Sequence, residues 1–136
     1  MAGAMASDAR NALVVEVGGP QGVEAVTVYA DRSARCDGVQ GPLVWDRPSD
    51  ALDLQIEALL DAGNALADGM APMDREQLAG LRFGEVRLLW LTPAGACGIE
   101  GPLVKLSSDP RMGDVLQRAS ALMRALRTEA RIQSRA

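Results

Sequence analysis

The sequence predicts an α+β fold, in which an antiparallel sheet of about 5–6 strands carries two main helices on one face. The first observation is a succession of alternating apolar and polar segments joined by short turns, which indicates antiparallel neighbouring strands. The second is a pair of longer segments that each carry one apolar stripe at helical spacing and must bury it. The third is the composition, since 136 residues with 48% hydrophobic and 24% charged side chains are typical of one globular domain.

The predicted domain covers residues 11–136 and consists of two related β-β-α halves. The halves lie at about 11–69 and 81–136, and a connector at 70–80 joins them. Residues 1–10 are small and polar, so we expect a flexible N-terminal tail there. This segment has neither the basic start nor the apolar centre of a signal peptide, and we expect a cytoplasmic protein.

The first half begins with strands. Leu13, Val15 and Val17 alternate with other side chains and predict the first strand, which the Gly-rich run at 18–22 ends. A second strand is expected at 23–30. Further along the chain, the sequence predicts a third strand at 33–38 and a short extended piece at 42–45.

The first helix begins after Ser49 and Asp50, because either side chain can accept a hydrogen bond from the free amides of the first turn. It is expected to run to about Asp68 and to stop at Gly69. In the connector, one short helical turn is expected at 74–79. The core stripe of the first helix comprises Leu52, Ile56, Leu59, Leu60, Gly63 and Leu66.

The second half repeats this order. A strand at 85–92, a turn at 92–95 and a returning strand at 96–99 form a predicted hairpin, and 102–106 is expected to be extended. Asp109 and Pro110 then suit the cap and first position of the last helix. The apolar face of that helix comprises Met112, Val115, Leu116, Ala119, Leu122, Met123, Leu126 and Ala130.

An internal repeat supports the two-half interpretation. Residues 36–44 and 97–104 both begin with cysteine and both end in Gly-Pro-Leu-Val, with a one-residue gap between the two copies. We therefore expect the halves to superpose, with chance as the alternative. Proline has no amide proton to give to a sheet, so Pro42 and Pro102 are interpreted as the first residues of short edge strands, with a ligand-gripping loop as the alternative.

No catalytic, cofactor-binding or metal-binding residue is predicted. The chain contains no histidine, the side chain most used as a base at neutral pH. Cys36 and Cys97 each lie on the apolar side of a strand and are interpreted as small buried residues, although a redox pair or half a metal site is an alternative. The run at 18–22 lacks the Lys-Ser/Thr of a phosphate-binding loop and is interpreted as a hairpin loop.

Charge separates along the chain. The net charge is −4, which argues against nucleic-acid binding, and no apolar run is long enough to cross a membrane. From Arg111 onward there are six arginines against two acidic residues, so the last helix is basic while the first is acidic. These stripes are interpreted as solvated faces or as surfaces for a partner.

We expect a homodimer that uses the helix faces, with charge setting the orientation and apolar contact holding the two copies together. Small alanines on the first helix allow a second backbone to approach closely. The candidate interaction surface comprises Ala51, Ala58, Ala62, Ala65, Asp53, Glu57, Asp61, Arg124, Arg127 and Arg131.

The predicted order of strands and helices is similar to that of small dimeric roadblock and longin adaptors, and to that of class I secretion chaperones, which are small, acidic and dimeric. No motif carries this similarity, so it transfers no residue roles. The function expected from the sequence is a non-catalytic protein-interaction module, such as a dimeric adaptor, a chaperone-like protein or a regulatory subunit. The alternative is a small-molecule-binding protein or an enzyme that uses carboxylate and arginine groups; a deep pocket with convergent polar groups would favour it.

Overall fold

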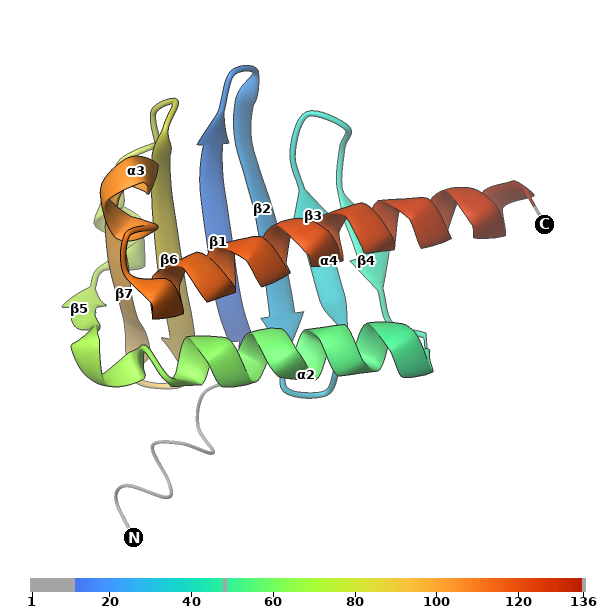
Figure 1. Cartoon of the computed structure of the whole chain (residues 1–136), viewed down its shortest axis with the longest axis horizontal. Coiled ribbons are helices and arrows are strands. Elements are labelled where there is room, and N and C mark those ends of the chain that lie inside the picture. The colour runs from blue at the N-terminus through green and yellow to red at the C-terminus, as the bar shows by residue number, and fades with distance from the viewer. Residues whose placement is uncertain (1–11, 48, 136) are drawn as a thin grey trace, which may run out of the picture.

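The computed structural model describes residues 12–47 and 49–135, with side chains to residue 132. Seven strands form one antiparallel sheet in the order β4-β3-β2-β1-β6-β7-β5 (Figure 1). The expected N-terminal tail, residues 1–10, lies outside the described residues. The strands are β1 (Ala12–Gly19), β2 (Gly22–Tyr29), β3 (Ala34–Asp37), β4 (Leu43–Trp45), β5 (Ala71–Met73), β6 (Glu85–Thr92) and β7 (Gly95–Pro102).

Two long helices, α2 (Asp50–Asn64) and α4 (Pro110–Arg135), lie side by side on the same face of the sheet (Figure 1). The hydroxyl of Ser49 accepts a hydrogen bond from the amide of Leu52 at 3.4 Å, which is the expected cap of α2. Three shorter pieces complete the helices: α3 (Leu103–Leu106), and the 3₁₀ turns η1 (Ala67–Gly69) and η2 (Arg75–Gln77). No helix in the described ranges is long and apolar enough to cross a membrane.

The core lies between the helices and the sheet. On the central strands, Leu13 and Val15 pair with residues of β2 and β6 that face the same way, so one apolar surface spans three strands. The residues that fill this layer are fully buried, and they include Leu13, Val15, Val26, Val28, Leu88, Leu52, Ile56, Leu59, Val115, Leu122 and Leu126. Burial of side chains of this kind typically contributes about 1.5–3 kcal/mol each.

Gly63 is the point where α2 lies closest to the sheet. A Cβ at this position would lie only 2.5 Å from Cδ2 of Leu13, so only glycine fits here without a shift of the neighbours. The carbonyl of Gly63 also accepts a hydrogen bond from Nε1 of Trp90 at 3.0 Å. This bond satisfies a buried indole and fixes α2 to β6.

The predicted α+β class and antiparallel sheet are confirmed. The two-helix prediction is only roughly matched, because the short helix α3 accompanies the two long helices on one face (Figure 1). The strand count differs, because β5 lies inside the predicted connector and pairs with β7 at the sheet edge. β5 has only three residues, one of them a proline, so it shows no alternation that periodicity could detect. The first helix is shorter than predicted, since α2 ends at Asn64 and η1 follows it.

The two Gly-Pro-Leu-Val blocks have different conformations. In the first block, Gly41 has a φ of 89° and Pro42 precedes the edge strand β4, as predicted. In the second block, Pro102 ends β7, and Leu103 and Val104 begin α3, so the predicted extended piece at 102–106 is wrong. The amide of Leu103 donates to the carbonyl of Gly84 at 2.7 Å, which turns the chain away from the sheet. The halves share the order of hairpin and helix, but not this local structure.

Candidate functional site

The acidic residues of α2 lie toward the turn between β2 and β3. Glu57 forms an ion pair with Arg32 of that turn. Glu57 and Asp61 line a hollow of about 350 Å³ there, together with Ala30, Arg32, Leu60, Asn64 and Trp90. Asp53 is half-buried on the same side of the helix. The structure therefore places part of the predicted acidic stripe in contacts within the chain.

The alanine strip lies on another flank of α2. At 3.6 residues per turn, Ala58 and Ala62 lie across the core stripe from Leu60, on the flank where α4 lies alongside (Figure 1). Both alanines are half-buried, and Ala62 packs against the core. Ala51 and Ala65, at the two ends of the helix, are exposed. Small side chains at 58 and 62 are thus used where the two helices meet.

The three predicted arginines of α4 come together. Arg124, Arg127 and Arg131 follow one another at helical spacing and line a groove of about 420 Å³ between α4, β2 and the β3–β4 turn. We call this the arginine groove, and its other lining residues are Glu24, Gln40, Ser120, Met123 and Thr128. An adjoining hollow of about 240 Å³ shares Gln40, Arg127 and Arg131 and adds the apolar side chains of Leu43 and Ala130.

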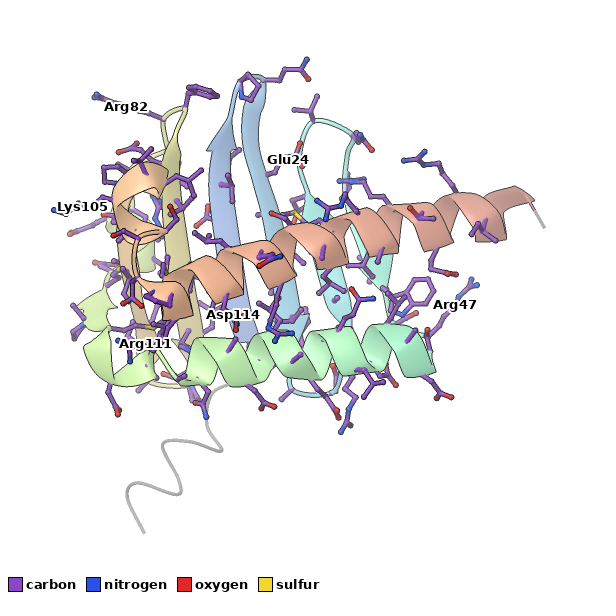
Figure 2. All side chains as sticks on the ribbon, in the orientation of Figure 1. Glu24, Arg47, Arg82, Lys105, Arg111 and Asp114 are labelled. Atoms are coloured by element: carbon purple, nitrogen blue, oxygen red, sulfur yellow. The ribbon has the colours of Figure 1, made fainter. Side chains whose placement is uncertain are left out.

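Two hydrogen bonds shape the arginine groove. Nη2 of Arg127 donates to the carbonyl of Gly41 at 3.2 Å, which holds the β3–β4 turn against α4. The carboxylate of Glu24 accepts a hydrogen bond from the amide of Val39 at 3.3 Å. Figure 2 shows Glu24 on β2, in the sheet layer behind α4. Within the described chain, Arg124 forms no ion pair. Three guanidinium groups against one carboxylate make the groove cationic.

The two cysteines do not form a pair. Cys36 on β3 and Cys97 on β7 are four strand spacings apart in the sheet, which corresponds to about 19 Å at the usual spacing of about 4.8 Å. A disulfide needs Cα atoms within about 7 Å, so a redox pair is ruled out in this fold. Both cysteines are free, and the described residues contain no cluster of three or more acidic or sulfur ligands that could hold a metal.

The sheet face away from the helices carries a feature that the sequence interpretation missed. A hollow of about 670 Å³ crosses this face; we call it the sheet-face hollow. One of its walls comes from the connector before β6, at Arg75 and Leu78. The remaining lining residues are Val14, Glu16, Val23, Ala25, Thr27, Tyr29, Arg35, Asp37, Arg87, Leu89 and Leu91. The signal in the sequence was β6, whose Leu89 and Leu91 make its second face apolar as well.

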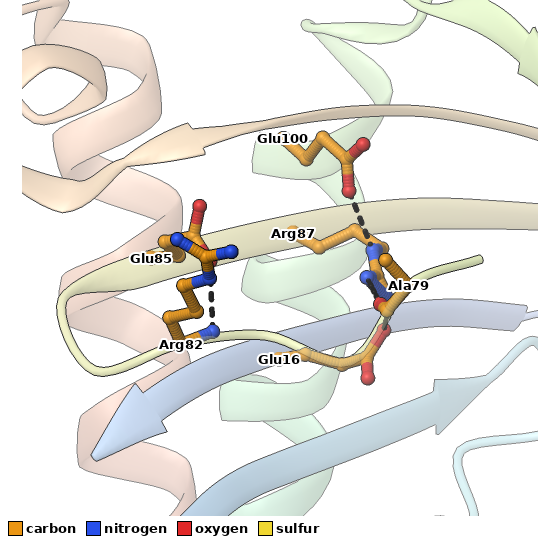
Figure 3. A network of polar contacts seen from close by, with 6 residues as sticks. All are labelled: Glu16, Ala79, Arg82, Glu85, Arg87 and Glu100. Carbon is orange, nitrogen blue, oxygen red and sulfur yellow. Dashed lines mark hydrogen bonds and ion pairs between the residues drawn. The ribbon is translucent and has the colours of Figure 1, made fainter. Parts of the chain in front are cut away.

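Arg87 is the polar centre of this face, and Figure 3 shows its contacts. Its side chain is only 4% exposed, and its Nε donates to Glu100 at 2.9 Å. Nη1 donates to Glu16 at 3.4 Å, and Nη2 donates to the carbonyl of Ala79 in the connector. A buried charge is tolerated only when it is paired, so this network both satisfies the guanidinium and holds the connector against the sheet.

Comparison of the chain with protein-family models, with curated proteins and with solved structures finds no match. The two surfaces themselves therefore indicate what the chain could bind. The arginine groove offers fixed positive charge beside hydroxyl and amide groups. The sheet-face hollow offers an apolar floor with charged groups at its margins.

Proposed function

We propose that the chain is a non-catalytic protein-interaction module, and that the arginine groove receives an acidic segment of its partner. The observation that carries this proposal is the convergence of Arg124, Arg127 and Arg131 on one groove whose lining includes a single acidic side chain, Glu24. A guanidinium presents a planar fork of donors that matches a carboxylate, so three of them in a row favour an acidic chain over a neutral one.

The chemistry of the groove suits binding better than catalysis. Arginine stays protonated at neutral pH, so none of the three can act as a general base. The hydroxyls of Ser120 and Thr128 and the amide of Gln40 add hydrogen-bonding groups beside them. Such groups recognise a ligand without changing its bonds.

The strength of the interaction follows from exposure. Arg124 and Arg131 are exposed, and exposed ion pairs contribute only about 0–1 kcal/mol each. Useful affinity therefore requires several pairs together with apolar contact, which Met123, Leu43 and Ala130 offer in and beside the groove. An acidic segment that also carries apolar side chains fits this surface, and its binding should weaken with salt.

The proposed module is also dimeric, but the charged surfaces do not pair two copies. The acidic side of α2 faces the β2–β3 turn, and the arginine groove lies on the far side of α4 (Figure 1). A two-fold dimer would have to make each acidic–basic contact twice within one interface, which surfaces on opposite sides of the helix pair do not favour. We therefore assign the dimer contact to apolar surface elsewhere, and we reserve the groove for a different partner.

The test is binding of a fluorescein-labelled peptide of alternating glutamate and leucine, followed by fluorescence anisotropy at low and high salt. The double variant Arg124→Gln/Arg131→Gln removes two groove charges. It should weaken binding by about tenfold, because two weak ion pairs with the peptide are lost together. A control, Arg111→Gln/Arg118→Gln, removes the same charge from α4 outside the groove, where each arginine is paired with a neighbouring aspartate.

The control variant should bind within about twofold of the unaltered protein, because a long-range charge effect is mostly screened. Equal weakening by both double variants would mean that the peptide responds to the net charge of the protein and that the arginine groove is not its binding site. A labelled peptide of alternating lysine and leucine should not bind to the groove, and tighter binding of that peptide would also contradict the proposal.

A further inference from the structure

The sheet-face hollow lies on the opposite side of the sheet from the arginine groove and has the dimensions of a ligand site. Its volume of about 670 Å³ falls within the range of about 300–1,000 Å³ that is usual for small-molecule sites. Its floor is formed by the outward faces of β6, β1, β2 and β3, which are neighbours in the sheet. Its wall on the connector side is held in place by Arg87 through the carbonyl of Ala79.

The floor is apolar although no helix covers it. Val14 pairs with Leu89 on one side and with Thr27 on the other, so three adjacent strands present these side chains next to one another. Ala25 and Leu91 extend this surface. One-sided antiparallel sheets normally have a polar outer face, so a group of apolar side chains beneath a hollow, interrupted by Thr27, favours a surface that is covered in use.

The charged side chains around the sheet-face hollow are paired with one another, apart from Arg75. Arg35 donates to Asp37 at 2.8 Å, and Arg87 is paired with Glu16 and Glu100. Arg75, the remaining charged lining residue, forms no ion pair within the described part of the chain. With Glu100 counted, three arginines face three carboxylates, so the hollow has no excess charge, and Arg75 is the lining guanidinium that has no ion pair in the described residues.

We propose that the sheet-face hollow binds a small organic anion with an apolar body, of the class of medium-chain or aromatic monocarboxylates. The apolar body lies across Val14, Ala25 and Leu91, and its carboxylate accepts hydrogen bonds from Arg75. One anionic group matches the one lining guanidinium without an ion pair, and an apolar body gains from covering the floor. A second polar group would have to displace contacts of the Arg87 network, so a monoanion is favoured over a dianion.

The shape of the hollow favours a small molecule over a protein surface. The connector rises over one side of the floor through Arg75 and Leu78, so a flat partner surface cannot reach Leu89 beneath it. Leu89 is only 4% exposed, so the part of the floor open to a ligand is formed by Val14, Ala25 and Leu91. The backbone groups of these inner strands are already paired, so the floor cannot accept an added strand.

The test is isothermal titration calorimetry with decanoate, with its alcohol and with its amine, each below its micelle concentration. Decanoate should bind saturably and the alcohol more weakly, by about tenfold for one lost charged contact. The amine should bind most weakly, because Arg75 repels it. Binding of the three compounds in any other order, or no saturable binding of decanoate, would overturn the proposal.

Substitutions in and beside the sheet-face hollow test whether decanoate binds there. Arg75→Gln should weaken decanoate binding about tenfold and leave binding of the alcohol unchanged. Arg82→Gln, at an exposed arginine between the connector and β6 that does not line the hollow, should change neither. Ala25→Phe places a ring over the floor and should abolish binding of both compounds. Because Arg75 is exposed, its substitution tests the site even if Ala25→Phe unfolds the chain. Equal effects of the two arginine variants would refute the site.

A second readout separates this site from the arginine groove. In methyl-resolved NMR spectra, decanoate should shift the signals of Val14, Leu89 and Leu91. The methyl group of Met123, which lines the groove, should not move. Shifts confined to Met123 would place the ligand in the groove and contradict the proposal for the sheet face.

Discussion

Cys36 shows how burial sets the chemistry of a single residue. It lies on the helix-facing side of β3 and is 1% exposed. Burial raises the pKa of its thiol to about 11, and the negative charges of Asp37 and Glu24 act in the same direction, whereas Arg127 lowers it. At neutral pH this side chain is therefore a neutral apolar group rather than a nucleophile.

We predict that Cys36 resists alkylation in the folded protein. Iodoacetamide at pH 8 should label the half-buried Cys97 first and should modify Cys36 only as the chain unfolds in denaturant. The variants Cys97→Ser and Cys36→Ser, each with one thiol left, separate the two rates by mass spectrometry. Rapid labelling of Cys36 in the absence of denaturant would show that its strand opens or that its thiolate is stabilised.

The raised pKa of this thiol predicts that the protein loses stability at alkaline pH. The folded pKa of about 11 lies above the ordinary value of 9.0, so the folded state holds the proton more tightly than the unfolded state does. The stability contributed by this group is complete below about pH 9 and is lost as pH rises toward 11. Urea titrations of the unaltered protein and of Cys36→Ala across that range should show a steeper decline for the unaltered protein; parallel declines would contradict the raised pKa.

At the scale of a helix, the packing around Gly63 restricts which side chain this position can hold. Alanine is usually better than glycine within a helix, by about 1 kcal/mol. At this position the added methyl group would lie 2.5 Å from Leu13 and 3.3 Å from the ring of Trp90, both of which are buried. Packing therefore outweighs helix propensity, because neither neighbour can move into solvent.

We predict that Gly63→Ala destabilises the fold by about 1–3 kcal/mol, the usual range for an overpacked core. The matched control is Gly69→Ala in η1, where a Cβ would meet nothing within 4 Å, and its free energy of unfolding should change by less than about 0.5 kcal/mol. Both values are measured by urea denaturation. Stabilisation by Gly63→Ala would show that α2 can shift away from β6.

The elements that could be predicted from sequence are those with a long local pattern. β1 and β6 are eight residues long and have apolar side chains at every second position, on their core face, and α2 and α4 carry continuous apolar stripes, so periodicity located them. β5 and α3 could not be located, because three or four residues hold too little pattern and their conformations depend on distant partners such as Cys97 and Gly84. The same repeated block is strand at Leu43 and helix at Leu103 for that reason.

The two candidate surfaces also differ in how far the sequence could predict them. The arginine groove was foreshadowed by the helical spacing of Arg124, Arg127 and Arg131, which is local information. The sheet-face hollow requires that Leu89, Val14 and Ala25 become neighbours and that the connector fold over them. That arrangement depends on strand order, which no pattern in this sequence specifies.

At the scale of the whole molecule, the sheet separates two surfaces of different character. The helix side carries the fixed charges of the arginine groove, and the open side carries the apolar floor of the sheet-face hollow. The floor and walls of the hollow come from the two halves of the chain, since Ala25 and Arg35 precede α2 while Arg75 and Leu89 follow it. A ligand in the hollow would therefore contact both halves and should stabilise the whole fold.

We propose the end of the molecule at β4 as the contact surface of the predicted dimer. β4 is a sheet edge of only three residues, and Val44 on it is 62% exposed. In Figure 1 the C-terminal part of α4 extends past this edge, and Ile132 in that part is 55% exposed. An uncovered edge strand is a template for pairing with another chain, and two copies related by a two-fold axis would cover both apolar side chains.

We predict a dimer at tens of micromolar that persists at high salt, because apolar contact rather than charge holds it, with a buried area on the order of 800 Å² per partner. Light scattering behind a sizing column gives the mass at low and high salt. The double variant Val44→Lys/Ile132→Glu should shift the protein toward a monomer, whereas Leu54→Lys, an equally exposed apolar residue on α2, should leave the mass unchanged. A strict monomer under both conditions would refute the dimer. Dissociation by Leu54→Lys but not by the double variant would move the contact to the outer face of α2, and dissociation by salt alone would show that charge holds the two copies together.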